Sequence, residues 1–321
     1  MATLTATLPR SEGESASRAT VAGCYSGFDA IFPACDLWDL TEGIYRGQAS
    51  VSFEQAQRNQ REFLLDEVGC GPGTRLLDIG CGYGTLLAQA AERRAAATGI
   101  TLSREQVRRT RSAGLDVRLT DYRNLPHTWD GQFDAVVANG SVEHFAQVKD
   151  AVHGTDDAVY RGFFRTARRL IDSDSRSGRM ATTIIHFERR PDPNDLLRNP
   201  FSFPRGSDEF HYTLLARAFG GWYPVAGQLE HCASGLFELI HDEDGTDDYR
   251  RTSEEWLARV KRALLSHRLL PILARSLPVV LREPIQFALL LYTMLVSQSW
   301  NWQFRGPNPP TRLLRQTWLA R

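Results

Sequence analysis

The chain has 321 residues and equal numbers of basic and acidic side chains, with 38 lysines and arginines against 38 aspartates and glutamates. A chain without net charge has no overall field that attracts nucleic acid, so no nucleic-acid partner is predicted. Its five cysteines form no C-x-x-C pair, which argues against a disulfide framework and against a metal site. This cysteine usage is typical of a reducing compartment, and we expect a cytoplasmic protein.

The first part of the chain is polar and then becomes helical in pattern. Residues 1–22 are small and polar without the apolar segment of an export signal, and they are interpreted as a disordered tail. Residues 23–68 have helical periodicity, with Ser52 as a candidate N-cap. We interpret residues 23–68 as an N-terminal helical lid.

Short apolar segments then alternate with helical segments. The expected strands are RLLDI, AAATGIT, DVRLT, FDAVVAN and RMATTIIHF. This alternation is typical of βαβ units, in which helices cover both faces of a parallel sheet. It predicts an α/β, Rossmann-like core over residues 69–256, with ligands bound at the carboxyl ends of the strands.

An irregular segment rich in arginine and proline, residues 188–218, interrupts this core on the expected substrate side. Arg189, Arg190, Arg198 and Arg205 could clamp a diphosphate or a phospholipid head group, because a guanidinium suits phosphate oxygens. A solvated loop whose acidic residues balance these arginines is the simpler interpretation.

Residues 257–321 are interpreted as a C-terminal helical cap. Pro271, Pro278 and Pro284 interrupt its most apolar part, so no helix of about 18 apolar residues is expected to span a membrane. These helices could be buried, or they could form a surface that meets lipid or a protein partner. Peripheral membrane contact and a homo-oligomer therefore both stay open.

The stretch LLDIGCGYG, residues 76–84, places three glycines directly after a predicted strand. Gly80, Gly82 and Gly84 would let the main chain approach a ligand closely where a helix begins. Their order differs from the dinucleotide-binding fingerprint, and Asp78 precedes them. The turn could be only a tight strand-to-helix connection, but a nucleoside-containing ligand is the interpretation we favour.

Polar side chains also follow the next three strands. Thr101 and Gln106 could bind ribose hydroxyls, in a stretch where Ser103 is also predicted to cap a helix. Asp121 could accept a hydrogen bond from an adenine amine, and Tyr122 could stack on the ring. The fourth strand ends in NGSVEHF, where Glu143 is a candidate catalytic carboxylate.

Three stretches, LLDIGCGYGTLL, ATGITLSREQ and NGSVEHF, together resemble the S-adenosylmethionine-dependent methyltransferases, and more narrowly the cyclopropane fatty acid and mycolic acid cyclopropane synthases. SFEQAQ, GGWYP and DYRRTSEEW extend the resemblance over most of the chain. It implies a class I methyltransferase sheet with a helical lid, S-adenosylmethionine as cofactor and S-adenosylhomocysteine as product. The cofactor-binding residues we predict are Tyr45, Asp78, Gly80, Cys81, Gly82, Gly84, Thr101, Leu102, Gln106, Asp121, Tyr122 and Asn139.

Members of this group hold a bicarbonate as general base, through two cysteines, a glutamate, a histidine and a tyrosine. Glu143 and Tyr249 match that pattern, but no cysteine follows Tyr45 and the last helix contains none. Thr183 occupies the histidine position, and His186 could replace it only if the strand bulges or ends there. The sequence therefore argues against a bicarbonate site, and the catalytic residues we predict are Glu143, Tyr249 and His186.

The predicted activity is carbon methylation of an alkene in an unsaturated lipid or isoprenoid acceptor, through a carbocation that Glu143 deprotonates. Aromatic side chains suit a cation, although ordinary packing also explains their presence; they are Trp222, Tyr223, Trp256, Trp300 and Trp302. Three alternatives stay open: a nitrogen or oxygen methyltransferase of a small aromatic or amine metabolite in secondary metabolism, a cyclopropane fatty acid synthase proper, and a catalytically silent protein that binds S-adenosylmethionine or lipid.

Overall fold

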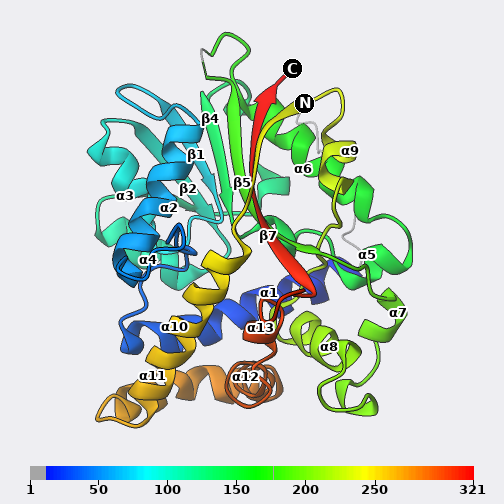
Figure 1. Cartoon of the computed structure of the whole chain (residues 1–321). Helices are drawn as coiled ribbons and strands as arrows, with labels where there is room; N and C mark the ends of the chain where they lie inside the picture. The colour runs from blue at the N-terminus through cyan, green and yellow to red at the C-terminus, as the bar shows by residue number, and fades with distance from the viewer. Residues whose placement is uncertain (1–11, 176) are drawn as a thin grey trace, which may run out of the picture.

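A seven-stranded mixed sheet forms the centre of the molecule (Figure 1). The computed structural model describes residues 12–175 and 177–321, with side chains from residue 21 onward. The strand order is β3-β2-β1-β4-β5-β7-β6; β1 to β5 are parallel, and β7 is antiparallel to both neighbours. The strands are β1 (Arg75–Ile79), β2 (Ala96–Thr101), β3 (Asp116–Leu119), β4 (Ala135–Asn139), β5 (Arg179–Phe187), β6 (Phe237–Asp244) and β7 (Thr311–Ala320).

The five strands expected from the alternating pattern are confirmed as β1 to β5. The central strands read as nearly continuous apolar runs because helices cover the sheet on both faces. In β4, for example, Ala135, Val136, Val137 and Ala138 are all fully buried. The Rossmann-like α/β class predicted from the sequence is therefore correct.

Helices α2 and α3 cover one face of the sheet, and α6 packs on the other. Leu64 and Leu65 of α2 share an apolar cluster with Leu86 of α3, whereas Phe163 and Phe164 of α6 belong to the main core. The helices beside the sheet are α2 (Phe53–Glu67), α3 (Thr85–Glu92), α4 (Arg104–Ser112), α5 (Val148–Val152), α6 (Asp156–Leu170) and α9 (Gln228–Ala233), and α7 (Pro193–Leu196) packs between α5 and α8 (Asp208–Phe219).

A second group of helices lies beyond the end of the sheet where β1 to β5 finish (Figure 1). We call this group the helical cover. It consists of α1 (Glu12–Ile31), α8 (Asp208–Phe219), α10 (Thr246–Leu264), α11 (Leu269–Arg282), α12 (Pro284–Leu291) and α13 (Ser299–Trp302). Short helical turns complete the chain: η1 (Phe32–Cys35), η2 (Tyr122–Asn124), η3 (His127–Trp129), η4 (Val142–His144), η5 (Pro200–Ser202) and the π-helical η6 (Tyr292–Val296).

The helix start expected at Ser52 is confirmed, since the Ser52 side chain accepts a hydrogen bond from the Gln55 N–H at 3.2 Å. The expected tail over residues 1–22 is wrong for residues 12–22, which belong to α1. Residues 1–11 lie outside the described part of the chain. The irregular segment 188–218 also becomes regular from Asp208, where α8 begins.

The interpretation of residues 257–321 as helical is wrong for residues 311–320, which form β7 inside the core sheet. This strand pairs with β5 along all nine residues of that strand and with β6 on its other side. Arg315 and Gln316 are both buried although they are polar. They therefore break the alternation of apolar and polar residues by which residues 311–320 could have been predicted as a strand.

Arg315 uses its guanidinium to connect four elements. Its Nε donates to Gln60 of α2 at 2.7 Å, and its Nη1 donates to Glu243 of β6 at 3.0 Å. Its Nη2 donates to Asp248 of α10 and to the carbonyl of Gly43, each at 3.1 Å. The strand is thereby fixed to segments more than 200 residues away in the sequence.

Across residues 12–175 and 177–321, no single helix is long and apolar enough to cross a membrane. Helices α10 and α11 pass such a test only as a pair, and they are bent by 103° at their junction.

We expect Arg315→Met to lower the free energy of unfolding by about 3–5 kcal/mol, because it removes the counter-charge of the mostly buried Asp248 and leaves the buried Gln60 amide and Gly43 carbonyl without their donor. Arg312→Met is the matched control: Arg312 lies on the same strand but is half exposed, and its ion pairs with Glu188 and Asp244 should contribute at most about 1 kcal/mol. Urea unfolding of the two variants measures both values. Equal losses in the two variants would contradict the structural role assigned to Arg315.

Candidate functional site

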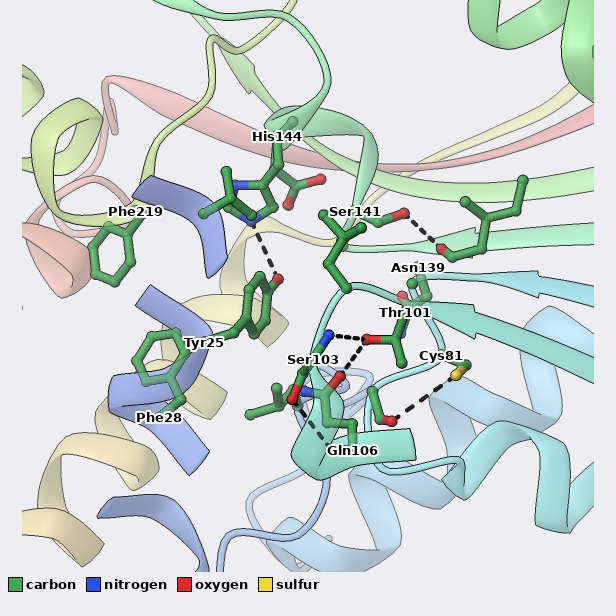
Figure 2. A pocket seen from close by; sticks show the side chains of 18 of the residues that line it. Tyr25, Phe28, Cys81, Thr101, Ser103, Gln106, Asn139, Ser141, His144 and Phe219 are labelled. Carbon is green, nitrogen blue, oxygen red and sulfur yellow. Dashed lines mark hydrogen bonds between the residues drawn. The ribbon is translucent and has the colours of Figure 1, made fainter. Parts of the chain in front are cut away.

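A large cavity lies at the carboxyl ends of the parallel strands, between the glycine turn and α1. Tyr25 and Phe28 of α1 face the strand ends across it (Figure 2). The Tyr25 hydroxyl lies 3.3 Å from Nε2 of His144, which follows β4. Helix α1 therefore covers the position in which ligands of such sheets bind.

Asp29 fixes α1 to the sheet side of the cavity. Its carboxylate accepts hydrogen bonds from the Tyr83 hydroxyl at 2.5 Å and from the Ser103 hydroxyl at 2.7 Å. Ser103 is also the N-cap of α4, as the sequence predicts. One acidic side chain thus connects the cover to the loops after β1 and β2.

The glycine turn after β1 has the backbone that its sequence predicts. Gly80, Gly82 and Gly84 have φ angles of +89°, +52° and +78°, which favour glycine. A Cβ on Gly80 would lie 2.7 Å from Cβ of Ser141, and one on Gly84 would lie 2.7 Å from a Leu115 methyl group. Gly80 and Gly82 line the cavity; Gly84 does not, because it packs against the end of α4.

Asp78, the last acid before this turn, lines the cavity and is buried. Burial, together with the nearby Asp39 carboxylate, raises the pKa of Asp78 to about 7. Asp39 is itself ion-paired with Arg61. A cationic ligand group beside Asp78 would favour its ionised form, so this corner of the cavity suits an ammonium group.

The first turn of α4, which follows β2, places the buried side-chain amide of Gln106 in the cavity wall. The Thr101 hydroxyl donates to the carbonyl oxygen of the Gln106 amide at 2.6 Å (Figure 2). The amide nitrogen of Gln106 is buried and has no partner among the described residues. Buried donors are normally satisfied, so a ligand acceptor such as a ribose hydroxyl fits here. Leu102 adds an apolar wall.

Asp121 and Tyr122 line the cavity at the end of β3. Asp121 accepts two side-chain hydrogen bonds from Arg123, each at 3.0 Å. Tyr122 stacks on Phe145, with ring centroids 4.1 Å apart. The predicted acid and aromatic ring therefore both stand at the β3 end of the cavity.

Glu143 lines the opposite end of the cavity. It is 4% exposed, and its Oε2 has no hydrogen-bond partner among the described residues. Burial is the main cause that raises its pKa to about 8, and the buried Glu42 carboxylate adds to the effect. Such a carboxyl can hold or release a proton near neutral pH.

Aromatic side chains surround this end of the cavity. Tyr223, Tyr249, Trp256 and Trp300 all line it. The Trp256 and Trp300 rings lie 5.3 Å apart, and those of Tyr249 and Trp256 lie 6.0 Å apart, between centroids. Burial and the nearby Glu143 raise the pKa of Tyr249 well above its usual value, so its hydroxyl stays protonated.

Two of the expected aromatic residues do not line the cavity. Trp222 packs edge-on against Phe187 at 4.9 Å, and Trp302 stacks on His211 at 4.4 Å, both between ring centroids. These two tryptophans belong to the packing of the core and cover.

Comparison with known proteins decides the family. A family model described as mycolic acid cyclopropane synthetase matches residues 41–268, well over half of the chain. The chain belongs to the mycolic acid cyclopropane synthetase family. This is a family of S-adenosylmethionine-dependent methyltransferases, and the ammonium corner, ribose donor and glycine turn described above fit that cofactor.

Individual relatives agree with this assignment. Cyclopropane mycolic acid synthase 2 of Mycobacterium leprae is 29% identical over 206 residues, which are 59% of this chain and 62% of the relative. A probable fatty acid methyltransferase of Mycobacterium tuberculosis is 39% identical over 104 residues, 30% of this chain and 24% of the relative. The matches thus span less than two thirds of these relatives. The cyclopropane synthase MmaA2 from Mycobacterium tuberculosis has the same fold, with a TM-score of 0.69 and 18% identity over 95% of this chain and 98% of its own.

Most of the residues predicted for this family's site are brought together on the cavity wall. Those that line it are Asp78, Gly80, Cys81, Gly82, Thr101, Leu102, Gln106, Asp121, Tyr122, Asn139, Glu143 and Tyr249. Tyr45, Gly84 and His186 do not. The Tyr45 ring lies under the Arg251 guanidinium, 3.9 Å from the ring centroid, and so faces α10.

His186 lies on the face of β5 away from the cavity. Ile185 lines the cavity, and consecutive side chains of a regular strand point to opposite faces. Nδ1 of His186 donates to the carbonyl of Ile184 at 3.0 Å, and burial lowers the pKa of His186 to about 4. Because β5 keeps its register with β7 through residue 187 without a bulge, His186 cannot take the place of the family histidine.

The residues around Glu143 do not fit the bicarbonate that the family resemblance implies. Of the five cysteines, Cys81 alone lines the cavity, and it belongs to the glycine turn. A second buried carboxylate, Glu42, already stands close enough to Glu143 to raise its pKa. A further anion between them would meet unfavourable like charge.

Glu42 is a residue that the sequence prediction missed. The Gln60 amide donates to its Oε1 at 2.6 Å. With its amide nitrogen toward Glu42, Asn139 donates to both carboxylate oxygens, at 3.1 and 3.2 Å. The stretch TEG shows no motif, and the only unusual feature nearby in the sequence is the absence of a cysteine after Tyr45.

The arginines of residues 188–218 do not form a clamp at the cavity. Arg189 and Arg198 pair with Asp208 and Asp195 at 3.7 and 3.2 Å. Arg190 pairs with Asp156 at 3.1 Å. The interpretation as a charge-balanced surface segment is the correct one for these three residues.

We expect Gly80→Ala to weaken the binding of S-adenosylhomocysteine by about tenfold or more, because the new methyl group would push the turn away from Ser141. Gly73→Ala is the control: Gly73 has a similar φ of +81°, nothing within 4 Å of an added Cβ, and no place in the cavity. Calorimetric titration measures both affinities. Equal weakening by the two substitutions would show that backbone strain, and not the cavity wall, is responsible.

Proposed function

We propose that this protein transfers the methyl group of S-adenosylmethionine to an alkene carbon of an unsaturated lipid or isoprenoid acceptor. The observation that carries the proposal is the carboxyl of Glu143, buried with an unpartnered oxygen in an aromatic wall. A carboxyl oxygen that has no hydrogen-bond partner among the described residues can accept a proton from an acceptor carbon.

Bound S-adenosylmethionine supplies an electrophilic methyl group: the alkene π electrons form the new carbon–carbon bond, the sulfur keeps the electrons of the broken carbon–sulfur bond, and the acceptor becomes a carbocation. The chain positions the reactants and excludes water. Gln106 and Asp121 hold the nucleoside end, Asp78 holds the ammonium group, and α1 closes the cavity.

The aromatic wall stabilises the cation through the negative faces of its rings. Glu143 then accepts the proton from the carbon next to the cationic centre, which gives a methyl-branched alkene. Tyr249, protonated at all relevant pH, contributes its ring and hydroxyl without competing as a base.

The charge of the cavity supports an apolar acceptor. Within the described residues, Arg123 is the only lysine or arginine that lines it, and Arg123 pairs with Asp121 at the nucleoside end. Burial lowers the pKa of His144 to about 4, so His144 is neutral. No cationic side chain is therefore available there to bind a phosphate near Glu143.

We expect Glu143→Gln to abolish methyl transfer while changing the affinity for S-adenosylhomocysteine by less than about tenfold, because the carboxyl acts on the acceptor. Glu188→Gln, at an exposed glutamate beyond β5, is the matched control and should keep wild-type turnover. Methyl-labelled cofactor is incubated with unsaturated phospholipids, polyprenyl diphosphates and amines, and the labelled fraction is identified. Label in the amine fraction would overturn the carbon acceptor, and no label with tight cofactor binding would favour a silent protein.

The pH dependence should follow the ionisation of Glu143. Only the ionised carboxylate accepts a proton, so kcat/KM should fall as pH decreases through about 8, the raised pKa of this group. In Glu42→Gln the neighbouring like charge is gone, and the acid limb should move down by roughly one pH unit. Glu188→Gln should leave the limb in place; an unmoved limb in Glu42→Gln would contradict the coupling of the two carboxyls.

A further inference from the structure

The outer surface of α11, the connection before it and the start of α12 together expose a set of large apolar side chains, which we call the apolar face. More than half of the exposed large hydrophobic residues in the described chain belong to it, including Leu270 at 73%, Leu281 at 74% and Ile285 at 82% exposure. Its members are Leu265, Leu269, Leu270, Leu273, Leu277, Val280, Leu281 and Ile285.

Helix α11 is apolar on two opposite sides. Ile272 is buried on its inner side, where α11 packs on α1. Leu270, Leu273, Leu277 and Leu281 recur at helical spacing on the outer side and meet solvent. A set of exposed apolar side chains of this size is unusual on a soluble surface, so the outer row indicates a surface that meets another apolar phase.

Basic residues accompany the apolar face. Between residues 261 and 300 the chain has five basic residues, Lys261, Arg262, Arg268, Arg275 and Arg282, against one acid, Glu283. Glu255 pairs with Arg262, Asp36 pairs with Arg268, and Arg275 donates inward to the Asp29 carbonyl. Lys261 and Arg282 remain exposed. Lys261 and Arg282 thus place positive charge near both ends of α11, where the exposed acid is Glu283.

We propose that the apolar face docks on a lipid bilayer that contains anionic head groups. The leucines would enter the boundary between head groups and acyl chains, and the basic residues would meet lipid phosphates. A second copy of the chain fits less well. A two-fold interface places the same surface on both sides, which would bring the basic residues against one another.

The apolar face lies on helices that pack over the cover of the cavity. Helices α11 and α12 pack on α1, on the side away from the sheet (Figure 1), and α1 lines the cavity with Tyr25 and Phe28. Two helix layers, α11 with α12 and then α1, therefore lie between the docked bilayer and the cavity. Docking does not depend on the proposed reaction, but it would bring a lipid acceptor to the cover of the site.

Co-sedimentation with vesicles tests the proposal. The full chain should sediment with vesicles of phosphatidylcholine mixed with phosphatidylglycerol, less with phosphatidylcholine alone, and less at high salt. Leu270→Ser with Leu281→Ser should weaken this binding by about tenfold or more. The control variant carries Leu119→Ser and Ile240→Ser. These two apolar side chains are each 42% exposed and lie on other elements, so this variant should bind the vesicles as the wild-type chain does.

Unchanged affinity for S-adenosylhomocysteine would verify that each variant is folded, and this measurement separates docking from catalysis. Failure of the wild-type chain to bind the anionic vesicles, or equal loss in the control pair, would overturn the proposal. Sedimentation velocity supplies a second test. A concentration-dependent dimer that the Leu270 and Leu281 substitutions abolish would also overturn the proposal, because the apolar face would then bind a second copy of the chain.

Discussion

The buried guanidinium of Arg315 is the interaction on which much of the remaining structure depends. It lies in the middle of the antiparallel strand β7 and is fully excluded from solvent. A cation in that position must be paired. The guanidinium of Arg315 donates to Glu243, Asp248 and Gln60, which lie on three different elements. The requirement to satisfy one buried charge therefore fixes how the last strand, the cover and helix α2 meet.

The same requirement extends to the candidate catalytic carboxyl. The Gln60 amide accepts from Arg315 with its oxygen and donates to Glu42 with its nitrogen. Glu42 in turn raises the pKa of Glu143. A carboxylate near a like charge, in an environment poor in water, is the arrangement that retains a proton near neutral pH. The electrostatics of the cavity are thus set partly by a residue of β7, which does not itself line the cavity.

How much could be predicted depends on whether a feature is local. The strands β1 to β5 and the glycine turn were predicted correctly, because apolar runs and positive φ angles are requirements of a few adjacent residues. Strand β7 was not, since the partners that make Arg315 tolerable in a core lie elsewhere in the chain. His186 was assigned to the site because the sequence leaves open whether β5 bulges, and the regular pairing with β7 decides that it does not.

The sequence by itself determined the family, the glycine turn and the carboxyl of Glu143, because each is encoded in a short stretch whose chemistry does not depend on distant residues. Tertiary structure alone decided that Glu42 stands beside Glu143, that α1 closes the cavity, and that one side of α11 stays exposed. An amphipathic or apolar pattern specifies which side chains avoid water, but only the packed fold determines which of them find a partner within the chain.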